Sequence, residues 1–243
     1  MNTSQPVTLR KAVFAIALVL GVWPLAARAT DVDKLLKSLE ERRGKVKSLH
    51  AVTEMVIRQP KAVRKNRFEY WELTSGETRK TKRVGRAEIL EKGKDKPRIA
   101  ESVSISDGKF QWSELPGTGT KTIIKSLATA SHDFGGLHDA MRGGKARTRP
   151  GEKLLGMKTV VIEVVNRGVG ASSKATYWIA EQNGIILKSR VTSSDGSSVE
   201  MDTSVCEVDI KIPESTFVFT APDGAQVIDT TTIGRNAGTG NSP

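Results

Sequence analysis

The stretch YWIAEQNGIILKSRVTSSDG, residues 177–196, decides the class of fold. It joins two segments rich in apolar and β-branched side chains, 174–180 and 185–192, through the dipeptide Asn183-Gly184. A second turn dipeptide, Asp195-Gly196, follows. Asn-Gly and Asp-Gly between such segments are typical of two-residue β-hairpin turns. This stretch therefore predicts consecutive antiparallel strands.

The strand pattern continues on both sides of this stretch. Residues 49–58 alternate with a period of two, which predicts a strand with one buried side. Asp107-Gly108 is a further turn signal between two strand-like segments. The other predicted strands are 67–74, 78–90, 99–106, 109–115, 121–124, 156–165, 197–212 and 216–220.

Two segments break the strand pattern and are predicted as helical. Residues 31–46 place Val32, Leu36 and Leu39 at helical spacing. Residues 126–141 have no clean alternation, and we expect one or two short helices there, interrupted at Gly135-Gly136, with a loop at 143–151. An antiparallel sheet buries one face, and these helices are the segments available to cover it. The sequence predicts a mainly β (α+β) fold, a curved antiparallel sheet with both helices in its concavity.

The N-terminus has the anatomy of a secretory signal. Arg10 and Lys11 precede an apolar run at 12–26, and Ala27-Arg28-Ala29 supplies small residues for cleavage after Ala29. The run is short for a membrane span. We expect a signal peptide at 1–29, one domain at 30–233, a disordered tail at 234–243, and a periplasmic, monomeric protein.

Charge and cysteine content narrow the class of protein. The chain carries a net charge of +11, of which three belong to residues 1–29, leaving +8. Such a charge favours anionic partners, but basic and acidic residues are interleaved and no nucleic-acid-binding signature is present. Nucleic acid is not an expected partner. A single cysteine, Cys206, excludes an internal disulfide, so the core must hold the fold.

Several stretches, taken in order, resemble the LolA-like superfamily, which includes the lipoprotein carrier LolA, the receptor LolB and the stress sensor RseB. They are KVKSLHAVTEMVI (45–57), SVSISDGKFQW (102–112), residues 177–196, and IPESTFVFTAPDGAQVID (212–229). The last fits the closing Phe-x-Phe-Thr-x-Pro-x-Gly signature of the family at Phe217, Phe219, Thr220, Pro222 and Gly224.

This resemblance implies an unclosed β-barrel with a helical lid over an apolar cavity that shields acyl chains in water. One departure matters. Where the carrier holds its lid with an arginine before a proline, this chain has Lys96-Pro97. Lysine lacks the planar fork of arginine, so that role is not transferred.

Apolar side chains of shared parity within their strands, with two from the helical insert, are the candidate ligand-binding set. An ordinary filled core is the alternative interpretation of the same residues. The set is Met55, Ile57, Phe110, Trp112, Leu137, Met141, Ile185, Leu187, Met201 and Val205.

No motif predicts a catalytic centre, a cofactor or a metal. Cys206 lies mid-strand and is typical of a small buried side chain, and no Gly-x-Ser-x-Gly elbow is present. His132-Asp133 and His138-Asp139 form a small repeat, but a spacing of six residues does not place both histidines on one helix face.

Three hypotheses about function follow. The first is a non-enzymatic periplasmic protein that binds acylated lipoprotein or lipid for outer-membrane sorting, with inner- or outer-membrane proteins as partners. The second is an RseB-like sensor that acts by protein contact. The third is an envelope-associated structural protein that uses its positive charge to sit on anionic membrane.

Overall fold

The computed structural model describes residues 29–115, 121–129, 134–142, 144–167 and 172–231. The predicted signal peptide, except Ala29, and the predicted tail at 234–243 lie outside the described residues.

The described chain is mostly β-strand. Two α-helices and one 3₁₀ helix, η1, complete it. In chain order the elements are α1 (Ala29–Arg43), β1 (Ser48–Gln59), β2 (Ala62–Ser75), β3 (Thr78–Glu91), β4 (Arg98–Ser106), β5 (Phe110–Leu115), β6 (Thr122–Leu127), α2 (Gly135–Met141), β7 (Gly144–Leu154), β8 (Met157–Arg167), β9 (Ser172–Ala180), β10 (Ile186–Ser193), β11 (Ser198–Val208), η1 (Glu214–Phe217) and β12 (Gln226–Asp229).

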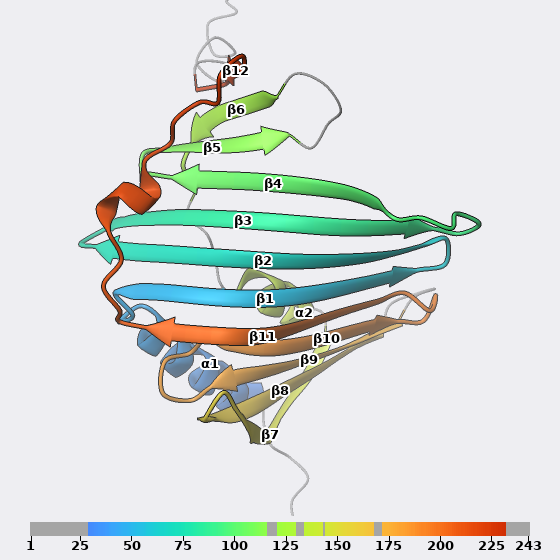
Figure 1. Cartoon of the computed structure of the whole chain (residues 1–243). Coiled ribbons are helices and arrows are strands. Elements are labelled where there is room, and N and C mark those ends of the chain that lie inside the picture. Colours follow the sequence, from blue (N-terminus) through green and yellow to red (C-terminus); the bar gives the residue numbers. More distant parts are fainter. Residues whose placement is uncertain (1–28, 116–120, 130–133, 143, 168–171, 232–243) are drawn as a thin grey trace, which may run out of the picture.

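All twelve strands belong to one sheet, ordered β12-β6-β5-β4-β3-β2-β1-β11-β10-β9-β8-β7 (Figure 1). Strand β1 lies inside the sheet because it pairs antiparallel with both β2 and β11. The edge strands β12 and β7 stand at opposite ends of this order, so the sheet does not close into a barrel. The predicted fold class, a curved and unclosed antiparallel sheet with two helices, is confirmed.

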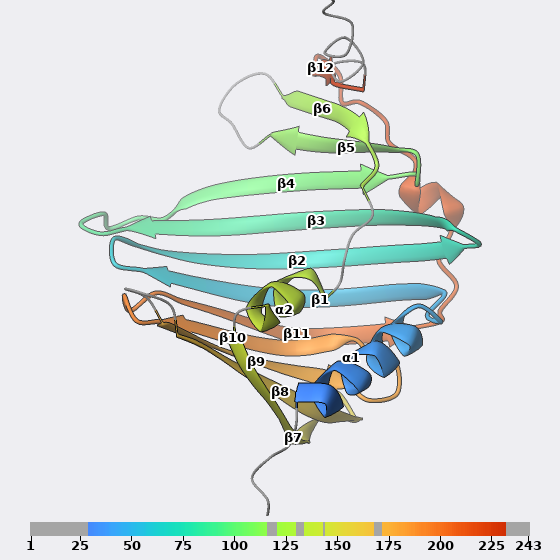
Figure 2. The ribbon, with the colours of Figure 1, turned by 180° about the vertical axis from the view of Figure 1, so that it is seen from behind.

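Both helices lie on the same face of the sheet, here called the inner face (Figure 2). The helical stripe of α1 is fully buried, with Val32, Leu36 and Leu39 no more than 3% exposed. Together with Phe134 and Leu137 it packs on side chains of β8 and β9, among them Ile162, Val164 and Ile179. The helices therefore fill the inner face over the C-terminal half of the sheet.

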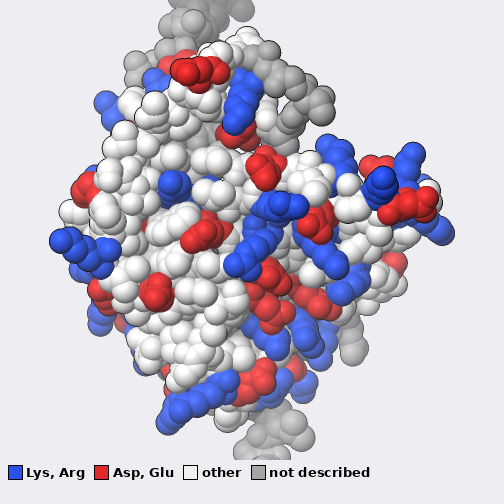
Figure 3. Space-filling view, in the orientation of Figure 1, with Lys and Arg blue, Asp and Glu red and all other residues white. Residues whose placement is uncertain are grey.

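Charges are mixed on the opposite, outer face. Lys and Arg side chains lie among Asp and Glu side chains there (Figure 3). Cross-strand pairs such as Arg67 with Glu54, whose nitrogen and oxygen are 3.0 Å apart, account for part of this mixing. The interleaving predicted from the sequence is therefore visible on this face.

The structure corrects several local predictions. The loop predicted at 143–151 is mostly strand β7, in which a register shift after Pro150 accommodates the proline next to β8. The strand predicted at 216–220 is instead the 3₁₀ helix η1 followed by extended chain. Strand β12 was not predicted, and it pairs with β6 in parallel, unlike every other described strand pair. In the helical insert, α2 begins at the glycines that were expected to interrupt it.

Gly184 fixes how close α1 approaches the turn between β9 and β10. Its φ is +69°, and a Cβ there would lie 2.1 Å from the carbonyl oxygen of Leu39. Gly196 has a similar φ of +84° but nothing within 4 Å of the same position. We expect Gly196→Ala to lower the free energy of unfolding by about 1 kcal/mol, through backbone strain alone. Gly184→Ala adds a backbone clash and should cost about 3 kcal/mol.

Urea unfolding of both variants checks this difference. Equal losses would mean that α1 does not rest on the β9–β10 turn as the structure shows.

Candidate functional site

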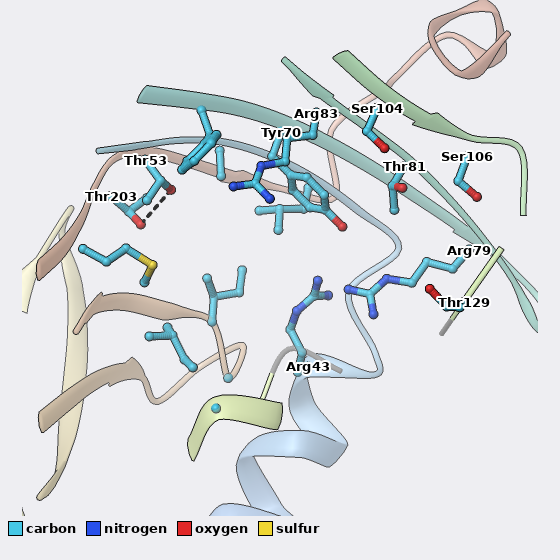
Figure 4. Close-up of a pocket in the computed structure, with 18 of the residues that line it drawn as sticks. Arg43, Thr53, Tyr70, Arg79, Thr81, Arg83, Ser104, Ser106, Thr129 and Thr203 are labelled. Carbon is cyan, nitrogen blue, oxygen red and sulfur yellow. Dashed lines mark hydrogen bonds between the residues drawn. The ribbon is translucent and has the colours of Figure 1, made fainter. Parts of the chain in front are cut away.

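The inner face over the N-terminal half of the sheet is hollow. A half-open cavity of about 940 Å³ lies between strands β1–β4 and β11 on one side and the end of α1, α2 and the start of β10 on the other (Figure 4). This volume is in the range of small-molecule and lipid sites, about 300–1,000 Å³. The inner face is therefore packed beneath the helices at β8 and β9 and open over β1–β4 and β11.

One wall of the cavity is apolar. Strand parity creates it, because Leu49, Ala51 and Met55 alternate on one side of β1 and Met201 pairs with Met55 across to β11. Leu137 on α2 and Ile185 before β10 close this wall from below. The apolar side chains of the cavity lining are Leu49, Ala51, Met55, Phe68, Ala128, Leu137, Ile185, Ile186 and Met201.

The other wall is polar and comes from β3, β4 and β5. Its side chains include Thr81, Arg83, Ser104, Ser106 and Gln111. The side-chain nitrogen of Gln111 donates to the Ser104 hydroxyl oxygen over 3.1 Å. The cavity is therefore amphipathic, and its two walls belong to different groups of strands.

A buried ion-pair cluster ties α1 to the sheet at one end of the cavity. The Glu72 side chain is 1% exposed, and its Oε2 accepts from Arg43 at 2.7 Å, from Arg79 at 2.5 Å and from the Tyr70 hydroxyl at 2.8 Å. Burial alone would raise the pKa of the Glu72 carboxyl, but the two guanidiniums outweigh it and hold the pKa below its usual value. Glu72 is thus ionised at neutral pH.

Arg83 differs from these two arginines. Its guanidinium carbon lies 3.7 Å from the centre of the Phe68 ring, a cation–π contact. Gly85 pairs with Phe68 across to β3, and a Cβ on Gly85 would lie 2.9 Å from that ring, so glycine leaves the room that Phe68 occupies. Partial desolvation by the surrounding side chains lowers the pKa of Arg83, although an arginine remains protonated at neutral pH.

Four residues of the candidate ligand-binding set line the cavity: Met55, Leu137, Ile185 and Met201. Leu187 is 1% exposed in the core beneath it, and Met141 packs against the helix core. Ile57 lies on the same side of β1 as Met55 but nearer the hairpin, outside the described lining. Their part in ligand binding stays a prediction.

Phe110, Trp112 and Val205 lie elsewhere, and local register explains why. The Asp107-Gly108 turn pairs Gln111 with the cavity residue Ser106, so its neighbours Phe110 and Trp112 face outward. There the Trp112 ring stacks on Phe219 at 5.5 Å.

A register shift between Val52 and Thr53 has the same effect on β11. Val205 pairs with Val52, whereas Thr203 pairs with the cavity residue Thr53. The shift moves Val205 to the side opposite Met201.

Sequence reasoning missed the polar wall altogether. Its parity was available, since Arg79, Thr81 and Arg83 are alternate residues of β3. The search for apolar residues passed over them, because polar alternates on a strand normally face solvent.

The surroundings of His138 and Cys206, considered above for a metal site and as a nucleophile, do not favour either chemistry. His138 on α2 contacts the Glu40 carboxylate on α1, while His132 and Asp133 lie outside the described residues. Burial raises the pKa of the Cys206 thiol to about 11, which makes it a poor nucleophile at neutral pH.

Comparison with known proteins gives similarities of structure only. No family model matches the sequence, and no curated protein matches it. The MucA/MucB complex of Pseudomonas aeruginosa matches at 15% identity with a TM-score of 0.48, over 82% of this chain and 63% of that chain. This chain therefore spans less than two thirds of the length of the chain it matches there.

Two other solved structures are similar over most of their own length. Lipoprotein LppX of Mycobacterium tuberculosis matches at 10% identity and a TM-score of 0.43, over 76% of this chain and 99% of that chain. A putative outer membrane lipoprotein-sorting protein domain from Vibrio parahaemolyticus matches at 15% identity and 0.32, over 76% and 96%. At these scores the function has to be argued from the cavity itself.

Replacing Glu72 tests the ion-pair cluster. Glu72→Gln removes the charge that two arginines share in a buried place, so we expect the free energy of unfolding at pH 7 to fall by about 3 kcal/mol. Because the folded pKa of Glu72 is depressed, its contribution is present above the unfolded value of 4.5 and is lost as pH falls through the folded value. The gap between wild type and variant should therefore narrow as the pH falls from above 4.5 through the lowered folded pKa of Glu72.

Denaturant unfolding across that pH range measures the gap. The control is Glu54→Gln, which breaks an ion pair between two exposed side chains and should change little. A gap between wild type and Glu72→Gln that is independent of pH would contradict the cluster.

Proposed function

We propose that this protein is an exported, non-enzymatic binding protein that takes the acyl chain of a lipoprotein or lipid into its cavity. The cavity itself carries this proposal. When no ligand is bound, the apolar side chains of its wall face water. An acyl chain that buried ten methylenes there would gain about 8 kcal/mol. That free energy is enough to keep an acylated molecule out of water. It is also small enough for the molecule to be released.

The chemistry of the lining supports binding rather than catalysis. Among the described residues that line the cavity there is no histidine and no cysteine. The Tyr70 hydroxyl donates to the Glu72 carboxylate, but Arg43 and Arg79 hold that carboxylate in an ion-pair cluster and lower its pKa, which makes it a weak base for activating a nucleophile. Burial and solvent exclusion are the functions that this lining supports.

Export and domain organisation belong to the same proposal. Residues 1–29 are a signal peptide cleaved after Ala29, and the mature protein acts in the periplasm. Residues 30–233 form one domain, which is supported by the pairing of β1 with β11, strands from opposite ends of the chain. Among the described helices none is long and apolar enough to span a bilayer.

Sorting to the outer membrane is the transport step that such a shield serves. The acylated lipoprotein or lipid is the cargo, and proteins of the inner or outer membrane are the sites of loading and delivery. A lipid chain cannot cross the aqueous periplasm unshielded, since each exposed methylene costs about 0.8 kcal/mol.

Blocking the cavity tests this function. Thr203 lines the cavity and bonds to Thr53 across the strand pair, with 3.3 Å between the hydroxyl oxygens. We expect Thr203→Trp to fill the space and to reduce retention of lipid or lipopeptide at least tenfold in native mass spectrometry after gentle purification. The matched control is Thr192→Trp, an exposed residue of β10 that does not line the cavity.

The control should bind like the wild type. A wild-type protein that neither retains nor accepts any acylated molecule would overturn the proposal. So would equal retention by wild type and Thr203→Trp.

A further inference from the structure

Arg83 lies on β3 in the polar wall of the cavity. Across the sheet it pairs with Tyr70 on β2 and Ser104 on β4, and Thr81 precedes it on the same side of β3. All four of these side chains line the cavity, into which Arg83 projects from the sheet (Figure 4).

The charge of Arg83 has no carboxylate partner within the described part of the chain. Arg43 and Arg79 both bind Glu72, whereas the contact found for Arg83 is the face of Phe68. Stacking on a ring orients the guanidinium plane and leaves its edge N–H groups available to an acceptor. The side chain is exposed through the open cavity.

A charge in this position selects among ligands. A neutral lipid that covered Arg83 would strip water from a cation and return no acceptor, which is costly. A ligand with a carboxylate or phosphate would instead make charge-assisted, bidentate hydrogen bonds to the guanidinium fork. The apolar wall lies opposite, so the same ligand needs an alkyl chain.

We propose that the ligand is an anionic amphiphile whose carboxylate or phosphate head binds Arg83 and whose alkyl chain lies along Leu49, Met55 and Met201. This inference rests on the proposed function and specifies the class of molecule that occupies the same cavity. Arg83 is then the residue that determines specificity, and the apolar wall supplies most of the affinity.

Three ligands that share the same alkyl chain length and differ in the head group test the inference. Isothermal titration calorimetry with dodecanoate, dodecyl phosphate and dodecanol, all below their aggregation limits, compares carboxylate, phosphate and neutral heads. We expect one or both anions to bind the wild type about tenfold more tightly than dodecanol. A titration with inorganic phosphate distinguishes recognition of a lipid head group from binding of a free anion. Inorganic phosphate should neither bind the protein nor compete with the alkyl ligands.

Variants assign the selectivity to Arg83. Arg83→Met keeps most of the side-chain volume and should remove the preference for anions, while Arg83→Lys should restore part of it because the charge returns without the fork. The control is Arg86→Met, which removes the same charge from the opposite side of β3, where Arg86 pairs with Glu88 at 3.7 Å. This control should keep the wild-type preference.

The outcomes separate the two proposals. If dodecanol binds the wild type as tightly as both anions, the inference fails and the proposed function stands. If none of the three alkyl ligands binds, the proposed function fails first. Competition by inorganic phosphate, or an unchanged preference in folded Arg83→Met, would also overturn the inference. The wild-type comparison decides the matter even where a variant does not fold.

Discussion

The structure depends on a mismatch between the sheet and the helices that must cover it. Twelve strands at about 4.8 Å spacing make a sheet roughly 50 Å wide along the inner face. The helices have 15 and 7 residues, which gives lengths of about 22 Å and 10 Å. They cover β8 and β9 and stop near β1. Because no described element covers the rest of the inner face, half of the sheet has a filled core and half borders a cavity.

The residues of the sheet follow this division. Where α1 and α2 pack, the inner face is largely apolar, as at Ile162, Val164 and Ile179, none of which is exposed at all. Where no helix packs, an empty cavity has to tolerate water, and β3–β5 present hydroxyl, amide and guanidinium groups instead. The apolar wall lies at the boundary between the two zones. An amphipathic cavity thus results when helices cover only half of an open sheet. The polar wall prevents the uncovered half from presenting one continuous apolar patch.

The sequence predicted the class of fold well and the site only in part, for reasons of register. Asn183-Gly184 and Asp107-Gly108 mark hairpins, and the pairing of neighbouring strands follows from chain order. Which side chains face inward depends on register shifts and turn geometry, and these leave a weaker pattern in the sequence. A single shift after Val52 turns Val205 away, and the turn before β5 decides between Gln111 and Trp112. Glycines and Pro150 hid β7, because such residues usually indicate loops.

An open cavity must also keep its shape when it is empty, and the cluster around Glu72 provides one means. Arg43 belongs to the last turn of α1, while Glu72 and Arg79 lie on β2 and β3, so one buried carboxylate joins the helix of the filled half to strands of the hollow half. Apolar residues there would pack together and draw the helix end onto the sheet. Two guanidiniums around one carboxylate instead hold a defined distance, because each must keep its hydrogen bonds to avoid an uncompensated buried charge. The same charges that cost free energy to bury therefore fix the end of α1 relative to β2 and β3 at one end of the cavity.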